Sequence, residues 1–248
     1  MKHPLPFRSA PLAGITALAA ILLLFAVRSD AAESRKLCIA IIGDSTVCDY
    51  KPEHPCRGWG QFLHEYFNDS VRIANHAASG RSTKTFIAEG RWKRTLDEKP
   101  DFILIQFGHN DSHAAGRPES TDAATDYRGF LRRYIDEARA AGAAPILVIP
   151  MHRRTFDAGG RLTDILRPYA EAMRAVAAEK NAPLIDLHTP SGRFFQELGE
   201  TRCPELANSP EDRTHFNEKG ARMMADMAMQ QLPAAAPRLA SEMKPPTR

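Results

Sequence analysis

Several short motifs that would assign a function directly are missing from this 248-residue sequence. There is no G-x-G-x-x-G after a strand-like run, which excludes a Rossmann dinucleotide site. There is no G-x-S-x-G either, which disfavours the nucleophile elbow of α/β-hydrolases. A strong charge is also missing: the formal net charge is only +3, so nucleic acid is not indicated as a partner.

Cysteine is scarce, with only Cys38, Cys48, Cys56 and Cys203. Their spacing matches no zinc pattern, so we expect neither a metal site nor another cofactor from them. Cys38 falls inside a strand-like run and is expected to be a buried thiol. Cys48 and Cys56 flank a short proline-containing loop that could carry a local disulfide, whereas Cys203 has no obvious mate.

Long apolar runs are absent except at residues 12–27. Two basic residues precede this run, and Ser29 and Ala31 stand at the −3 and −1 positions of a plausible cleavage site. The pattern predicts a secretory signal peptide over residues 1–31. We therefore expect a secreted or periplasmic protein of net charge +1, with no stable membrane association after cleavage. An uncleaved anchor is the alternative.

Short apolar runs alternate with helix-compatible stretches along the rest of the chain. The strand-like runs are 36–42, 71–75, 102–107, 145–149 and 183–187, and the helical stretches are 58–68, 83–99, 121–141, 168–180 and 218–232. This alternation predicts an α/β fold, a three-layer doubly wound (flavodoxin-like) five-stranded parallel sheet with helices on both faces. We assign residues 32–232 to one domain. Residues 233–248, rich in alanine and proline, are predicted to form a loose tail.

Polar residues follow the strand-like runs, where ligands bind in open α/β sheets. Ser45, Gly80 and Asn110 follow the first three runs, and Asp212 and His215 precede the last helix. Each has an ordinary structural interpretation: a helix cap, a turn glycine, a loop amide, a helix-start pair. Together they supply an acyl-transfer site. His215 could take the proton of the Ser45 hydroxyl while Asp212 orients the imidazole.

Donors for a developing oxyanion are available in the same blocks. They are the backbone N–H groups of Ser45 and Gly80 and the side-chain amide of Asn110. His109, His113 and His152 lie near the expected site, and we expect each of them to be structural or solvated.

Four sequence blocks resemble those of the SGNH hydrolases, also called GDSL-like esterases. The blocks are "GDST", "AASGRS", "GHND" and "DRTHF", in the order of the family, and the resemblance covers roughly residues 36–231. It implies that Ser45 is the nucleophile, that Gly80 and Asn110 complete the oxyanion hole, and that Asp212 and His215 complete the triad. "SGRS" and "QFGHND" look closest to the rhamnogalacturonan acetylesterase branch.

We therefore predict a serine esterase that removes acetyl groups from an O-acetylated carbohydrate such as rhamnogalacturonan. A lipase or thioesterase for longer acyl chains is one alternative, and a non-catalytic glycan-binding domain is another. A metallophosphoesterase with Asp44, His76, Asn110 and His215 as ligands is disfavoured. Neither a D-x-H in the first strand nor a G-D-x-x-D is present, and "GHND" has Asn and His in the opposite order.

Overall fold

The computed structural model describes residues 1, 3 and 35–245, and a single compact unit begins at Lys36. The predicted signal peptide lies outside the described residues, except for residues 1 and 3. Within the described part of the chain, no helix is both long and apolar enough to cross a bilayer.

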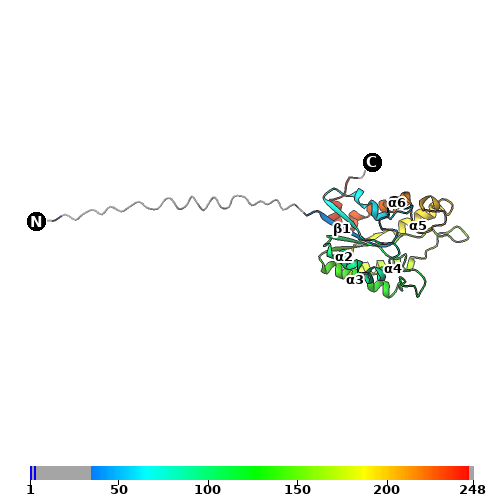
Figure 1. The fold of residues 1–248 in the computed structure, drawn as a ribbon, viewed down its shortest axis with the longest axis horizontal. Coiled ribbons are helices and arrows are strands. Elements are labelled where there is room, and N and C mark those ends of the chain that lie inside the picture. Colours follow the sequence, from blue (N-terminus) through cyan, green and yellow to red (C-terminus); the bar gives the residue numbers. More distant parts are fainter. Residues whose placement is uncertain (2, 4–34, 246–248) are drawn as a thin grey trace. The chain divides into compact units, whose positions relative to one another are not determined.

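A five-stranded sheet forms the centre of this unit (Figure 1). All of its pairings are parallel, and the strand order is β2-β1-β3-β4-β5. This is the flavodoxin-like order, so the predicted fold class is confirmed. The strands are β1 (Leu37–Ile42), β2 (Val71–Asn75), β3 (Phe102–Ile105), β4 (Ala144–Ile149) and β5 (Leu184–Asp186).

Helices cover both faces of the sheet. In Figure 1, α2, α3 and α4 lie on one side of the strands and α5 and α6 on the other. The helices are η1 (Trp59–Tyr66, a 3₁₀ helix), α1 (Thr83–Ala88), α2 (Arg91–Asp97), α3 (Asp126–Ala140), α4 (Arg167–Lys180), α5 (His188–Leu198), η2 (Cys203–Leu206), α6 (Glu218–Met229), α7 (Leu232–Ala235) and α8 (Pro237–Ala240).

Two apolar cores result from the alternation of side chains along the strands. In β1, Ile39 and Ile41 pack with η1, α5 and α6, whereas Ala40 and Ile42 pack with α1 to α4. Because both faces are buried, every position of the central strands must be apolar, which explains why the runs in the sequence are continuous.

The helices differ from the prediction in several places, and the one expected over 121–141 begins only at Asp126. The single helix expected over 83–99 is two helices, because Gly90 adopts a left-handed conformation (φ +69°) between α1 and α2. Helix α5 was not expected at all. Pro168 in the first turn of α4 and Gly142 just beyond α3 (φ +84°) are placed as predicted.

The C-terminal segment is not a loose tail in the structure. Residues 232–240 form α7 and α8, and Leu232 and Leu239 are fully buried in the core on the α6 side of the sheet. Beyond them, Met243 bridges to Phe67, and the Lys244 N–H donates to the Tyr66 carbonyl at 2.8 Å. A few large apolar side chains anchor the segment, although its average composition is poor in them.

The four cysteines are all buried thiols, so the local Cys48–Cys56 disulfide that the loop could have carried is not formed. The Cys48 thiol contacts the Ser45 carbonyl (3.9 Å), and the Cys56 sulfur accepts from the Asn208 amide (2.9 Å). The sulfurs of Cys48 and Cys56 therefore contact different polar groups and not each other.

Candidate active site

The turn after β1 presents Ser45 at the carboxyl end of the sheet. Asp44 Oδ1 accepts from the backbone N–H and the hydroxyl of Thr46 at 2.9 and 2.8 Å. The Gln106 amide, at the end of β3, donates to the same hydroxyl. A Cβ on Gly43 would lie 2.7 Å from the Gln106 carbonyl, so only glycine fits beneath this turn.

A continuous hydrogen-bonded chain joins Ser45, His215 and Asp212. The Ser45 Oγ lies 2.9 Å from His215 Nε2, and His215 Nδ1 lies 2.9 Å from Asp212 Oδ2. Ser45 is 170 positions from His215 in the sequence, so this contact depends on the whole fold. The imidazole is thus placed to accept a proton from the serine hydroxyl.

Asp212 is held in its ionised form. Partial burial alone would raise its pKa. Two backbone donors oppose this, the N–H groups of His215 (2.8 Å) and Thr214 (2.7 Å), and together with the imidazole they lower the pKa of Asp212 below its ordinary value. A carboxylate that remains ionised can stabilise an imidazolium formed during the reaction.

Arg154, which the sequence analysis did not identify, is hydrogen-bonded to the backbone of the loop that carries Asp212 and His215. Its side chain is only 1 % exposed, and its Nη2 donates to the carbonyls of His215 (2.6 Å) and Asp212 (3.3 Å). The guanidinium stacks over the Phe216 ring at 4.3 Å. Burial lowers the pKa of Arg154 to about 10. The contacts to carbonyls carry no sequence signal, because any residue provides a carbonyl.

Gly80 and Asn110 lie in two loops that are joined by a hydrogen bond. The Asn110 amide donates to the Arg81 carbonyl at 3.0 Å, next to Gly80. An amide has two N–H groups, so a second one is available to an oxyanion. Gly80 has φ +80°, and a Cβ there would point into open space. The positive φ therefore explains why position 80 is a glycine, whereas steric crowding does not.

Two further buried acids lie under the same loops. Asp44 Oδ2 is 3.4 Å from His109 Nδ1, and both side chains are inaccessible. Asp111 accepts from the Thr83 N–H (3.2 Å) and hydroxyl and from the Thr121 hydroxyl (2.9 Å). Of the two roles considered for His109, structural or solvated, burial excludes the solvated one.

A groove of about 520 Å³ adjoins the loops that carry Ser45 and Gly80. Its floor includes the Tyr50 and His54 rings, which stack with centroids 4.5 Å apart. The Tyr50 hydroxyl donates to the Ser45 carbonyl at 2.8 Å, which connects the groove to the candidate nucleophile. The lining residues are Cys48, Asp49, Tyr50, Lys51, Glu53, His54, Pro55, Ala77, Ala78 and Ser79.

The ligand set of a metallophosphoesterase is not assembled here. His76 Nε2 contacts Glu98 (3.3 Å), and the Asn110 amide donates to a carbonyl. Among the described residues, the group of side chains with metal-ligand spacing consists of His152, Asp164 and His188 and includes none of the proposed ligands.

Comparison with known proteins is consistent with this geometry. A model of the GDSL-like lipase/acylhydrolase family matches residues 41–223. The rhamnogalacturonan acetylesterase RhgT of Bacillus subtilis (strain 168) is 36% identical over 204 residues, covering 76% of this chain and 86% of RhgT. The protein named "Probable rhamnogalacturonan acetylesterase YesY", from the same strain, is 40% identical over 195 residues, covering 76% and 89%.

The fold is also that of a solved structure. The crystal structure of Bacillus subtilis YxiM superposes with a TM-score of 0.71 at 30% identity. The match covers 80% of this chain and 56% of that protein.

Proposed function

This chain belongs to the GDSL-like lipase/acylhydrolase family and is a carboxylic ester hydrolase, and from that premise we propose that it deacetylates rhamnogalacturonan. The observation that carries the chemistry is the unbroken contact from Ser45 Oγ through His215 to Asp212. The polysaccharide is proposed from the names of the two most similar relatives reported above, which cover three quarters of the chain.

The reaction begins with attack of Ser45 Oγ on the acetyl carbonyl carbon. His215 Nε2 accepts the hydroxyl proton, and Asp212 stabilises the imidazolium. The carbonyl oxygen becomes an oxyanion, which the N–H groups of Ser45, Gly80 and Asn110 stabilise. The intermediate collapses when the sugar oxygen leaves with the proton from His215, and the acetyl group remains on Ser45.

Hydrolysis of the acetyl-enzyme uses the same groups. His215 removes a proton from water, the resulting hydroxide attacks the acetyl carbonyl, and acetate leaves as Ser45 Oγ recovers the proton. Ser45 and His215, which exchange the hydroxyl proton, are already in hydrogen-bond contact. The mechanism therefore needs no residue outside the described site.

The groove beside Ser45 supports a carbohydrate substrate. The Tyr50 and His54 rings provide an aromatic surface for the C–H face of a sugar. Lys51 and Glu53 provide charged groups at its edge. A binding site that combines apolar faces with a few polar groups suits an amphipathic ring better than an alkyl chain.

Substrate profiling tests this proposal. We expect release of acetate from acetylated rhamnogalacturonan with kcat/KM well above that on acetylated xylan, and hydrolysis of p-nitrophenyl acetate in preference to p-nitrophenyl octanoate. Preference for octanoate would identify a lipase or thioesterase instead. Binding of the polysaccharide without acetate release would identify a glycan-binding protein.

We also propose that the protein is exported, on the basis of the N-terminal pattern over residues 1–31. Intact mass measurement of the protein recovered outside the cytoplasm should give a chain that starts at Ala32. Recovery of the full-length chain in the membrane fraction would indicate an uncleaved anchor instead.

A further inference from the structure

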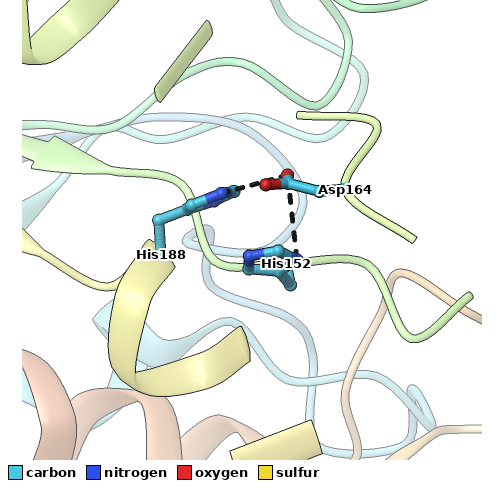
Figure 2. Close-up of side chains that lie close together, drawn as sticks. All are labelled: His152, Asp164 and His188. Atoms are coloured by element: carbon cyan, nitrogen blue, oxygen red, sulfur yellow. Dashed lines mark ion pairs between the residues drawn. The ribbon is translucent and has the colours of Figure 1, made fainter. Parts of the chain in front are cut away.

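His152, Asp164 and His188 bring their side chains together from three separate segments (Figure 2). His152 follows β4, Asp164 precedes α4, and His188 is the first residue of α5. Asp164 Oδ1 lies 3.1 Å from His188 Nε2 and 3.9 Å from His152 Nδ1. One ligand atom from each residue lies within 4.8 Å of the others.

The two nitrogens of His188 both face acceptors. Nδ1 lies 3.2 Å from the Pro150 carbonyl, and Nε2 faces the Asp164 carboxylate. A neutral imidazole has only one N–H, so it satisfies only one of these contacts. The His188 Nε2 and Asp164 Oδ1 atoms are buried and have no hydrogen-bond partner. A metal ion bound to His188 Nε2 and Asp164 Oδ1 would give both of these buried atoms a partner.

Outer contacts fix the orientation of these side chains. Arg167 Nε donates to the other oxygen of Asp164 at 3.1 Å. The backbone N–H of His152 donates to the Ser191 hydroxyl at 3.0 Å, which ties the segment that carries His152 to α5. A Cβ on Gly192 would lie 2.7 Å from His152 Nε2, so the glycine leaves room for the ring. Such supporting contacts are typical of metal sites.

We propose that His152, Asp164 and His188 bind a divalent transition-metal ion, Zn²⁺ by the chemistry of the ligands. Two imidazole nitrogens and one carboxylate oxygen are ligands that zinc prefers. Bonds of about 2.0–2.1 Å in a tetrahedral site place ligand atoms roughly 3.4 Å apart. The contacts of 3.1 and 3.9 Å lie on either side of that value.

Binding requires a small movement of His152. Its ring stacks on that of His188, with centroids 3.8 Å apart and 25° between the planes. An ion cannot lie in both of these planes at once, so we expect the His152 ring to rotate toward Asp164.

The ion would stabilise the segment 152–154, which contacts the candidate active site. Arg153 and Arg154 directly follow His152, and they donate to the hydroxyl of Thr214 (3.1 Å) and to the carbonyl of His215 (2.6 Å). A metal that ties this segment to α5 stabilises the folded state by mass action. We therefore expect Zn²⁺ to raise the thermal midpoint of the enzyme without participating in ester hydrolysis.

Calorimetry and optical spectroscopy on the chelator-treated full-length protein test the proposal. We expect one equivalent of Zn²⁺ to bind, and one equivalent of Co²⁺ to give the intense visible absorption of a tetrahedral site. Asp164→Asn should lower the affinity for Zn²⁺ by at least roughly 100-fold, because loss of an outer contact alone costs about 10–100-fold. The zinc-dependent rise in thermal midpoint should disappear with it.

Two variants control for other histidine sites. His113→Gln removes a histidine with a single carboxylate partner, Glu119 at 2.6 Å, and should bind Zn²⁺ like the wild type. His215→Gln removes the candidate catalytic base and should also retain the ion. If Asp164→Asn fails to fold, as judged by circular dichroism, His152→Gln takes its place. The contact of His152 Nδ1 with Asp164 is the longer of the two (3.9 Å against 3.1 Å), so its loss should disturb the metal-free fold least.

Three results would overturn the proposal. The first is a wild-type protein that binds no stoichiometric Zn²⁺. The second is a folded Asp164→Asn or His152→Gln variant with wild-type affinity. The third is loss of binding in His215→Gln, which would place the ion in the active site.

Discussion

Two histidine–aspartate pairs lie at the carboxyl ends of the strands and differ in their second partner. His215 contacts Asp212 through Nδ1 and the Ser45 hydroxyl through Nε2, both at 2.9 Å. His188 contacts its aspartate through Nε2 and the Pro150 carbonyl through Nδ1. A hydroxyl both donates and accepts, whereas a carbonyl only accepts. The first imidazole is therefore satisfied when neutral, and the second is not.

A histidine next to an aspartate therefore does not by itself indicate a catalytic role. The neutral His215 has a lone pair directed at a hydroxyl proton, as a general base requires. His188 faces no hydroxyl: its two nitrogens face the Asp164 carboxylate and the Pro150 carbonyl. The partner at the far nitrogen thus separates the histidine that we propose as the catalytic base from the one that we propose as a metal ligand.

The most severe way to break the first pair is Ser45→Ala. Since Ser45 is the proposed nucleophile, we expect kcat to fall at least roughly 10⁴-fold. The thermal midpoint should remain nearly unchanged, because the variant removes only one oxygen, whose partner His215 is partly exposed to solvent. Acetate release and differential scanning calorimetry measure the two quantities.

Covalent labelling provides an independent check on the nucleophile. A fluorophosphonate should modify Ser45 in the wild type, and mass spectrometry should find no label in Ser45→Ala. Ser70→Ala, a change at an exposed serine bonded to Glu242, is the matched control and should be labelled normally. Labelling of a different serine in the wild type would show that the nucleophile is misassigned.

Asn110 tests the oxyanion side of the comparison. Its amide is proposed to donate most strongly in the transition state, so Asn110→Ala should lower kcat by roughly 10²–10³ with little change in KM. Asn110→Asp should be at least as damaging, because a carboxylate repels the oxyanion. The measurement is kcat and KM on an acetyl ester.

A chelator distinguishes this role from that of a metal ligand. EDTA should leave the kcat of the wild type unchanged at 25 °C, even if it removes an ion from His152, Asp164 and His188. A chelator-inactivated wild type together with an active Asn110→Asp variant would refute the oxyanion role and the triad mechanism.

Arg154 offers a milder perturbation of the same pair. Arg154→Met removes the contacts to the His215 and Asp212 carbonyls, and the resulting misplacement of the imidazole should lower kcat about 10-fold. The thermal midpoint should change little, because the variant also removes a buried charge that has no carboxylate within 4 Å among the described residues. Arg154→Lys should recover part of the rate. Equal labelling rates in the wild type and Arg154→Met would contradict a positioning role.

Most of the architecture was predictable because both sheet faces are buried. A strand such as β1 must then be apolar throughout, and this leaves a clear signal. Helices α7 and α8 have no comparable sequence pattern, because their buried residues, Leu232 and Leu239, are isolated among alanine and proline. The break at Gly90 was missed because a glycine within a helical pattern does not reveal its φ.

The candidate site was predictable only where side chains carry the chemistry. Ser45, Asn110 and His215 stand in blocks directly after or before regular elements, so their convergence followed from the sheet topology. Arg154 acts on backbone carbonyls, and Asp164 lies in a loop with no motif. Their contributions depend on distances that the sequence does not encode locally.

A third aspartate sharpens the comparison, because Asp111 has no cationic partner. It is fully buried and accepts only from the neutral groups of Thr83 and Thr121; among the described residues, no lysine, arginine or histidine nitrogen lies within 4 Å. Burial raises its pKa to about 7 from an ordinary value of 3.8, despite these hydrogen bonds. For Asp212 and Asp164, burial alone would act in the same direction, but their charged or backbone partners lower the pKa.

The raised pKa of Asp111 predicts an effect on stability and not on catalysis, a loss of stability as the pH rises. Between pH 3.8 and about 7 the folded state retains a proton that the unfolded state has lost. The contribution of Asp111 is therefore complete below pH 3.8 and declines as the pH rises through 7. Asp111→Asn does not titrate, so its free energy of unfolding should rise relative to that of the wild type by up to about 1.4 kcal/mol per pH unit in this window. Urea unfolding of both proteins at pH 4.5, 5.5, 6.5 and 7.5 measures this difference. A constant difference across that range would mean that Asp111 is ionised throughout, and that its three hydroxyl and N–H donors compensate its charge as fully as a cation does.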